Sequence, residues 1–204
     1  MALEYWLNLD WVLALSVIWW SLAIAMVRVY PQQVAVWSGP FTQGAIGLLV
    51  LLPAWWGLVV LHRQEGGSWW MLYAFLLVWG ADTGAYFAGR ALGKNKLAPR
   101  VSPGKTIEGL LGGLLVTAVI ALLVATQTAA LQTISLWWFM LVSLVAVVGS
   151  VFGDLAESMF KRHRGLKDSS QILPGHGGIL DRIDSITAAV PLFAAGMLLL
   201  GAFH

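Results

Sequence analysis

Apolar residues occur in long runs along this chain, and charged or turn residues separate the runs. A bilayer core about 30 Å thick needs about 20 apolar residues of helix to cross it. Runs of about this length cover residues 11–27, 44–61, 69–88, 107–126, 134–152 and 186–202. The pattern predicts an all-α, polytopic integral membrane protein with about six transmembrane helices. Because no linker or repeat separates these runs, we expect residues 1–204 to form a single membrane domain.

The amino-acid composition excludes several classes of function. Of the 204 residues, 59% are hydrophobic and only 11% are charged, which excludes a soluble enzyme. The net charge of +2 is too small to indicate a nucleic-acid partner, whereas the 12 Trp residues are typical of membrane interfaces. The chain has no Cys, so any metal site must be built from oxygen or His ligands.

The basic residues are distributed unevenly between the connections. Residues 89–106 hold five of the 12 Lys and Arg residues, residues 153–185 hold five more, and Arg28 follows the first run. Connections rich in Lys and Arg stay in the cytoplasm. We therefore predict two basic cytoplasmic loops in a protein of the cytoplasmic (inner) membrane, with both termini and Arg63 on the outer side.

Residues 154–184 contain 10 of the 22 charged residues, and five of the ten are acids. Asp181 and Asp184 are three residues apart, which places them on one face if the last helix begins before them. Asp154 and Glu157 repeat this spacing. Clustered carboxylates suit Mg²⁺, which prefers a few carboxylates together with water and phosphate oxygens. The alternative is that Lys161 and Arg182 neutralise the acids in ion pairs.

A glycine-rich turn, Leu-Pro-Gly-His-Gly-Gly at 173–178, lies between these acids. Glycine leaves the backbone free to direct N–H groups toward an anion. With basic residues on both sides, the turn is a candidate polyphosphate cradle. His176 could contact phosphate, relay a proton or form a structural hydrogen bond.

The other basic loop contains Ser102-Pro103-Gly104-Lys105-Thr106. Ser102 or Thr106 could cap a helix N-terminus, where free N–H groups suit phosphate. A Walker A motif is excluded, because Pro99 stands where that motif requires glycine.

Asp82 lies within the third apolar run, where an unpaired carboxylate at the bilayer centre costs about 2.5 to 3.5 kcal/mol. Its small neighbours leave room for a ligand, a cation or a partner helix, and an interhelical hydrogen bond is the alternative. The pairs Gly80/Gly84, Gly89/Gly93 and Gly109/Gly113 have the spacing of closely packed membrane helices.

Several motifs together resemble the phosphatidate cytidylyltransferase (CDP-diacylglycerol synthase) family. They are Trp79-Gly80-Ala81-Asp82-Thr83-Gly84-Ala85-Tyr86, Gly89-Arg90, Gly93-Lys94, the segment 102–106, Gly153-Asp154, Glu157-Ser158, Met159-Phe160-Lys161-Arg162, Lys167-Asp168, Pro174 and His176-Gly177-Gly178-Ile179-Leu180-Asp181-Arg182-Ile183-Asp184. The resemblance begins near Trp69, so it divides the chain into N-terminal spans over 1–68 and a catalytic region over 69–204. Typical members are longer, and about three of their N-terminal spans have no counterpart here.

The resemblance implies a Mg²⁺-dependent transfer of the cytidylyl group of CTP to phosphatidic acid. CDP-diacylglycerol, a phospholipid precursor, and pyrophosphate would be the products, and a homodimer is left open. By position, it makes Asp154, Asp181 and Asp184 the metal-binding and catalytic acids. It assigns substrate contacts to Asp82, Ser102, Lys105, Thr106, Ser158, Lys161, Arg162, Lys167, Asp168, His176, Gly177, Gly178 and Arg182.

Two other functions remain open from the sequence. A CTP-dependent polyprenol or lipid kinase would instead transfer the γ-phosphate to an alcohol, but the complete match from His176 to Asp184 favours the cytidylyltransferase. A cation transporter would use Asp82 as an intramembrane ion site. That function would leave the ten clustered charges of residues 154–184 unexplained.

Overall fold

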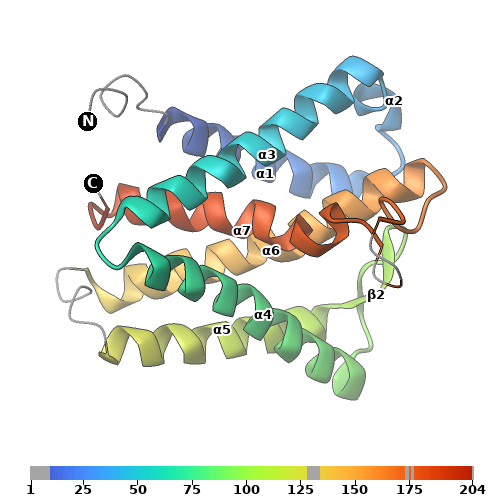
Figure 1. Cartoon of the computed structure of the whole chain (residues 1–204). Coiled ribbons are helices and arrows are strands. Elements are labelled where there is room, and N and C mark those ends of the chain that lie inside the picture. Colours follow the sequence, from blue (N-terminus) through green and yellow to red (C-terminus); the bar gives the residue numbers. More distant parts are fainter. Residues whose placement is uncertain (1–9, 128–133, 173–174, 176, 204) are drawn as a thin grey trace.

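A computed structural model describes residues 10–127, 134–172, 175 and 177–203 (Figure 1). These residues form helices apart from one short hairpin. The elements are α1 (Asp10–Val29), α2 (Val34–Trp37), α3 (Pro40–Arg63), α4 (Gly67–Leu92), β1 (Lys96–Ala98), β2 (Ser102–Thr106), α5 (Ile107–Gln127), α6 (Leu136–His163) and α7 (Leu180–Leu199). Within the described residues, six helices are long and apolar enough to cross a membrane. The predicted all-α, polytopic membrane fold is confirmed.

Helices α6 and α7 form the centre of the bundle. They pack against each other, with α1 and α3 on one side and α4 and α5 on the other (Figure 1). The α6–α7 loop, the β1–β2 hairpin and α2 lie together at the right-hand end of the bundle in this view. The two regions predicted to carry the chemistry are therefore brought to the same end.

Small residues allow α4 and α5 to approach closely. A Cβ atom added at Gly113 would lie 2.8 Å from the carbonyl oxygen of Ala81, and one added at Gly84 would lie 2.7 Å from the carbonyl oxygen of Gly112. Real Cβ atoms are not found this close to backbone oxygens, so only glycine fits at these two positions. The close packing predicted from the glycine spacing is confirmed along this seam.

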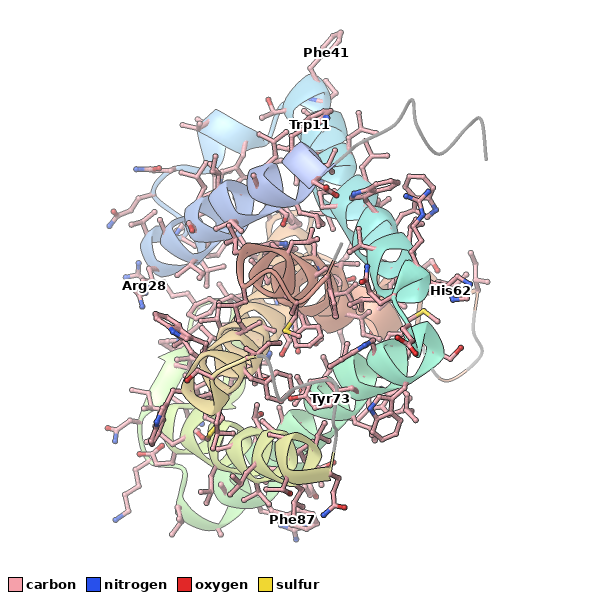
Figure 2. All side chains as sticks on the ribbon, turned by 90° about the vertical axis from the view of Figure 1, so that its left-hand side faces the viewer. Trp11, Arg28, Phe41, His62, Tyr73 and Phe87 are labelled. Carbon is pink, nitrogen blue, oxygen red and sulfur yellow. The ribbon has the colours of Figure 1, made fainter. Side chains whose placement is uncertain are left out.

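The opposite end of the bundle is held by aromatic side chains from α4, α6 and α7. Tyr73 stacks on Phe139 at a ring-centroid distance of 5.3 Å and also contacts Phe193. The Tyr73 hydroxyl lies 2.7 Å from that of Ser143, which donates to the Phe139 carbonyl oxygen. Figure 2 shows Tyr73 inside the bundle, whereas Phe41 and Phe87 project from its periphery.

The predicted helix ends were wrong where charged residues begin. Helix α6 continues to His163 rather than ending at residue 152, and α7 begins at Leu180 rather than at 186. The loop between them is therefore residues 164–179, not 153–185. An apolar run stops at its first charged residue, but a helix continues where that residue has a partner, as Glu157 has in Lys161 one turn later.

The segment from Ser102 to Thr106 is a strand rather than the start of a helix. It pairs antiparallel with β1, with Lys96 opposite Thr106 and Ala98 opposite Ser102. Ser102 is therefore not a helix cap. Thr106 does cap a helix, because its hydroxyl oxygen accepts a hydrogen bond from the Gly109 N–H at 3.1 Å.

Candidate functional site

The candidate site lies where α6 and α7 cross. Gly153 permits this crossing, because a Cβ atom there would lie 2.7 Å from the carbonyl oxygen of Asp184. The contact brings the carboxylates of Asp154 and Asp184 into electrostatic interaction, and both also interact with Asp82 of α4. Three acids that are far apart in the sequence therefore face one region.

Lys105 of β2 supplies the positive charge at the centre of this group. Its Nζ atom lies 2.7 Å from Asp154 Oδ2 and donates to the carbonyl oxygen of Val151 at 3.3 Å. Asp82 and Asp184 also interact electrostatically with this amine. The Lys105 amine can therefore neutralise the carboxylates of three helices, or a phosphate that binds beside them.

Glu157 adds a fourth, buried carboxyl group. Its Oε2 accepts a hydrogen bond from Lys161 at 3.0 Å, whereas Oε1 is buried without a partner among the described residues. The carboxyl groups of Glu157 and Asp184 also interact electrostatically. Two neighbouring carboxylates repel unless a proton or a cation is shared between them.

Asp181 has a different environment. Its carboxylate accepts hydrogen bonds from the Gly178 N–H at 2.7 Å and from the N–H and hydroxyl of Ser169, both at 2.9 Å. It also forms an ion pair with Lys161. These bonds fold the glycine-rich end of the 164–179 loop around the first turn of α7. Lys161 therefore neutralises acids in ion pairs, as the alternative to a metal site predicted, and its partners are Asp181 and Glu157.

The three predicted metal ligands are not gathered into one cluster. In the part of the chain that the structure describes, no three His, Asp or Glu side chains are grouped so that they could hold a metal ion. Asp154 and Asp184 interact with each other, but the hydrogen bonds of Asp181 go to the loop. Any cation held at the crossing by Asp154 and Asp184 would need substrate or water oxygens to complete its coordination.

The other predicted substrate-binding residues surround this centre. Ser158 donates to Asp154 Oδ1 at 3.2 Å, and Arg162 donates to the carbonyl oxygens of Val101 and Leu166, tying α6 to the hairpin and the loop. Arg182 lies in the first turn of α7. Lys167, Asp168, Gly177 and Gly178 belong to the loop, and Gly177 has a φ of +80°, which favours glycine. His176 lies outside the described residues.

Two cavities are lined by residues of this group. The first, here called the α4–α5 cavity, has a volume of about 370 Å³. Its lining includes Asp82, Tyr86, Arg90, Lys105, Thr106 and Val151. The second, here called the α1–α3 cavity, has a volume of about 270 Å³ and reaches Gly153, Glu157 and Asp184.

Three of these lining residues were missed as site residues from the sequence. Glu157 was noticed for its spacing from Asp154, but spacing does not show which acid is buried. Tyr86 lies near the end of the predicted third span and Arg90 just beyond it, and the Arg90 guanidinium donates to the Tyr86 hydroxyl at 3.0 Å. Their spacing of four residues was the available indication that the two side chains share a helix face.

Residues 2–200 match the model of the cytidylyltransferase family. The chain belongs to this family. A cytidylyltransferase of Pseudomonas aeruginosa named phosphatidate cytidylyltransferase is 52% identical over 184 residues, which are 90% of this chain and 68% of that protein. The Haemophilus influenzae protein of the same name is 46% identical over 196 residues, covering 92% of this chain and 68% of that protein. The family inferred from the motifs is thus confirmed, and the kinase and transporter alternatives gain no support.

Proposed function

We propose that this cytidylyltransferase acts on phosphatidic acid, joining it to the cytidylyl group of CTP to give CDP-diacylglycerol and pyrophosphate. The observation that carries the proposal is the Lys105 amine among the carboxylates of Asp82, Asp154 and Asp184, with one cavity lined by Lys105 and Asp82 and another by Asp184. The name shared by the relatives from P. aeruginosa and H. influenzae supports the same substrate pair.

The reaction needs no protein nucleophile. An oxygen of the lipid phosphate attacks the α-phosphorus of CTP, a new P–O bond forms, and the bond to pyrophosphate breaks. Nucleophile and electrophile are both anions, so their repulsion is the main barrier. The protein lowers it by holding the two phosphates in line and by neutralising their charge.

Lys105 is the residue best placed to neutralise this charge, because it already lies at the three-acid centre. Arg90 lines the α4–α5 cavity together with Lys105, and we assign it to the nucleotide phosphates. Ser158 orients the Asp154 carboxylate through its hydrogen bond. Asp181, with Lys161, holds the 164–179 loop against the start of α7 and so positions this side of the site.

The carboxylates of Asp154 and Asp184, with the partnerless oxygen of Glu157 nearby, fit a hard divalent cation such as Mg²⁺. Asp154 and Asp184 would hold the ion. It would polarise the phosphoryl oxygens and offset the charge that develops on the leaving pyrophosphate. Lys105, which pairs with Asp154, would neutralise charge on the same phosphates.

The proposed location is the inner membrane, with the site facing the cytoplasm. Residues 89–106 and 153–185, which include the hairpin and the loop at the site end, carry ten of the 12 Lys and Arg residues, which indicates the cytoplasmic side. CTP would reach the site from the cytosol. The lipid phosphate would arrive from the adjacent leaflet.

Labelled nucleotide tests the reaction. The purified protein is incubated with phosphatidic acid, Mg²⁺ and CTP labelled at either the α- or the γ-phosphorus, and label in the lipid phase is counted. We expect label from the α-position alone. Label from the γ-position with a polyprenol present would indicate a kinase instead, and no transfer from either position would contradict the proposal.

Two substitutions test the acids at the crossing. Asp154→Asn and Asp184→Asn keep the side-chain shape and remove the charge, and we expect each to lower turnover by at least about 100-fold. Glu65→Gln, on the exposed connection between α3 and α4, is the control and should retain full turnover. All three proteins should elute as wild type on size exclusion. Near-normal turnover in both Asn variants would overturn the assignment of these acids.

A further inference from the structure

The α1–α3 cavity has one polar end and one apolar end. Its polar groups come from the site end of the bundle, where Gln43, Glu157 and Asp184 line it. Farther along α1 and α3 the lining is apolar, with Trp20, Ile46 and Leu51. The eight-residue step from Gln43 to Leu51 corresponds to about 12 Å of helix, so the cavity extends from the site toward the middle of the spans.

We propose that the α1–α3 cavity binds the phosphate-proximal part of one acyl chain of the lipid phosphate, and that Gly47 sets the room available to that chain. This inference rests on the proposed function. It adds where the lipid substrate binds and which residue limits the space for its acyl chain. The lipid phosphate then lies at the site end of the cavity, where Arg164 can neutralise it, and the chain runs along α3 away from the site.

The linings of the two cavities differ in polarity, and this difference assigns one substrate to each cavity. A nucleoside triphosphate needs several charged or hydrogen-bonding partners, and the α4–α5 cavity offers Arg90, Lys105 and Thr106. The α1–α3 cavity offers few polar groups beyond its site end. There Arg164 donates a hydrogen bond to Gln43 at 2.7 Å, which places a cation where a phosphate would meet the chain.

The size of the cavity also favours a single chain. Sites that enclose a drug-sized ligand have volumes of about 300 to 1,000 Å³, and this cavity has about 270 Å³. It can hold part of one acyl chain but not a complete diacyl lipid. The second chain and the end of the first remain in the bilayer.

A substitution at Gly47 can fill the cavity without a clash of its Cβ atom. It lines the cavity, yet a Cβ atom added to it meets nothing within 4 Å. Gly44, one turn earlier on α3, has equally open space at its Cβ position but is not part of the lining. Substitutions at these two glycines therefore form a matched pair that differs in access to the cavity.

The first experiment compares Gly47→Leu with Gly44→Leu on dibutyryl and dioleoyl phosphatidic acid. We expect Gly47→Leu to lower kcat/KM for the dioleoyl lipid by about tenfold or more, because a leucine side chain competes with several methylene groups for the cavity. The dibutyryl lipid places fewer methylene groups in the cavity and should lose much less, and Gly44→Leu should match wild type on both lipids. Equal losses on the two lipids, or equal losses in the two variants, would overturn the inference.

The second experiment measures binding without turnover. Because the chain has no Cys, Gly47→Cys and Gly44→Cys each introduce a single thiol that can be labelled with N-ethylmaleimide in detergent. We expect dioleoyl phosphatidic acid to slow labelling at position 47 but not at position 44. Equal slowing by dioleoyl phosphatidylcholine would show that the cavity takes any lipid and would overturn the assignment.

The two experiments fail in distinguishable ways. If wild type transfers no cytidylyl group with either lipid, the proposed function fails, whereas thiol protection still reports on the cavity. If wild type is active and position 47 is neither protected nor sensitive to chain length, the cavity assignment alone fails.

Discussion

Carboxylates with the same sequence spacing have different surroundings in this protein. Asp181 and Asp184 are three residues apart on α7, yet Asp181 is bonded to Lys161 and the 164–179 loop, whereas Asp184 interacts with Asp154 and Glu157. The donors around Asp181 match its acceptor oxygens, so this side chain is already satisfied. Asp184 faces other acids and has interactions left to make with a cation or a substrate.

The two aspartates should therefore respond differently to the same substitution. Asp181→Asn replaces an acceptor oxygen with a donor that faces other donors, and we expect it to lower the free energy of unfolding by about 1 to 3 kcal/mol. The 164–179 loop should then be cut faster by trypsin after Arg164 or Lys167. Asp184→Asn serves as the comparison and should leave the cleavage rate unchanged. Identical digestion of the two variants would contradict a loop-anchoring role for Asp181.

The sequence was sufficient to select most of the charged residues at the site. Asp82, Lys105, Asp154 and Asp184 were all predicted, because a charge beside an apolar run is conspicuous. The separate environment of Asp181 was not predicted, since it depends on Ser169 and Gly178 folding back across a loop. The burial of Glu157 was missed for a similar reason, because it depends on the position of α7.

At the scale of elements, the α4–α5 seam gives the sharpest prediction. Gly113→Ala places a methyl group against the Ala81 carbonyl oxygen of α4. We expect a loss of about 1 to 3 kcal/mol in stability, because the two helices must move apart. Thermal unfolding in detergent measures the loss. Gly44→Ala is the control, since open space surrounds that position, and equal effects from the two substitutions would show that the seam is not tightly packed.

Element boundaries and the hairpin were harder to predict than the seam. The glycine spacing is a local pattern, and it correctly indicated close approach of helix backbones at these glycines, although not which helices meet. The hairpin depends on pairing between β1 and β2, and Lys96 and Thr106 are ten residues apart. The last three turns of α6 depend on Lys161 and Lys105 as partners for its acids. A run of apolar residues shows neither which strands pair nor which charged residues form ion pairs.

At the scale of the whole molecule, the orientation in the membrane can be tested directly. In cells that express single-cysteine variants of this Cys-free chain, Gly104→Cys labels the hairpin and Glu65→Cys labels the connection between α3 and α4. We expect an impermeant maleimide to reach Gly104→Cys only in inverted membrane vesicles and Glu65→Cys only from outside. The reverse pattern would place the site on the outer side and contradict a cytosolic supply of CTP.

Aromatic packing contributes at both ends of the bundle, including Trp37 on Phe160 at the site end, but the ion pairs of Lys105 and Lys161 lie at the site end. At the end with Tyr73, Phe139 and Phe193, aromatic rings pack together, and such contacts respond little to dissolved ions. At the site end, Lys105 joins the hairpin to α6 through an ion pair with Asp154 that is partly open to solvent and therefore weakened by salt. Raising the ionic strength should therefore weaken the tie between the hairpin and α6, at the end that must admit two substrates, and leave the Tyr73 cluster unchanged.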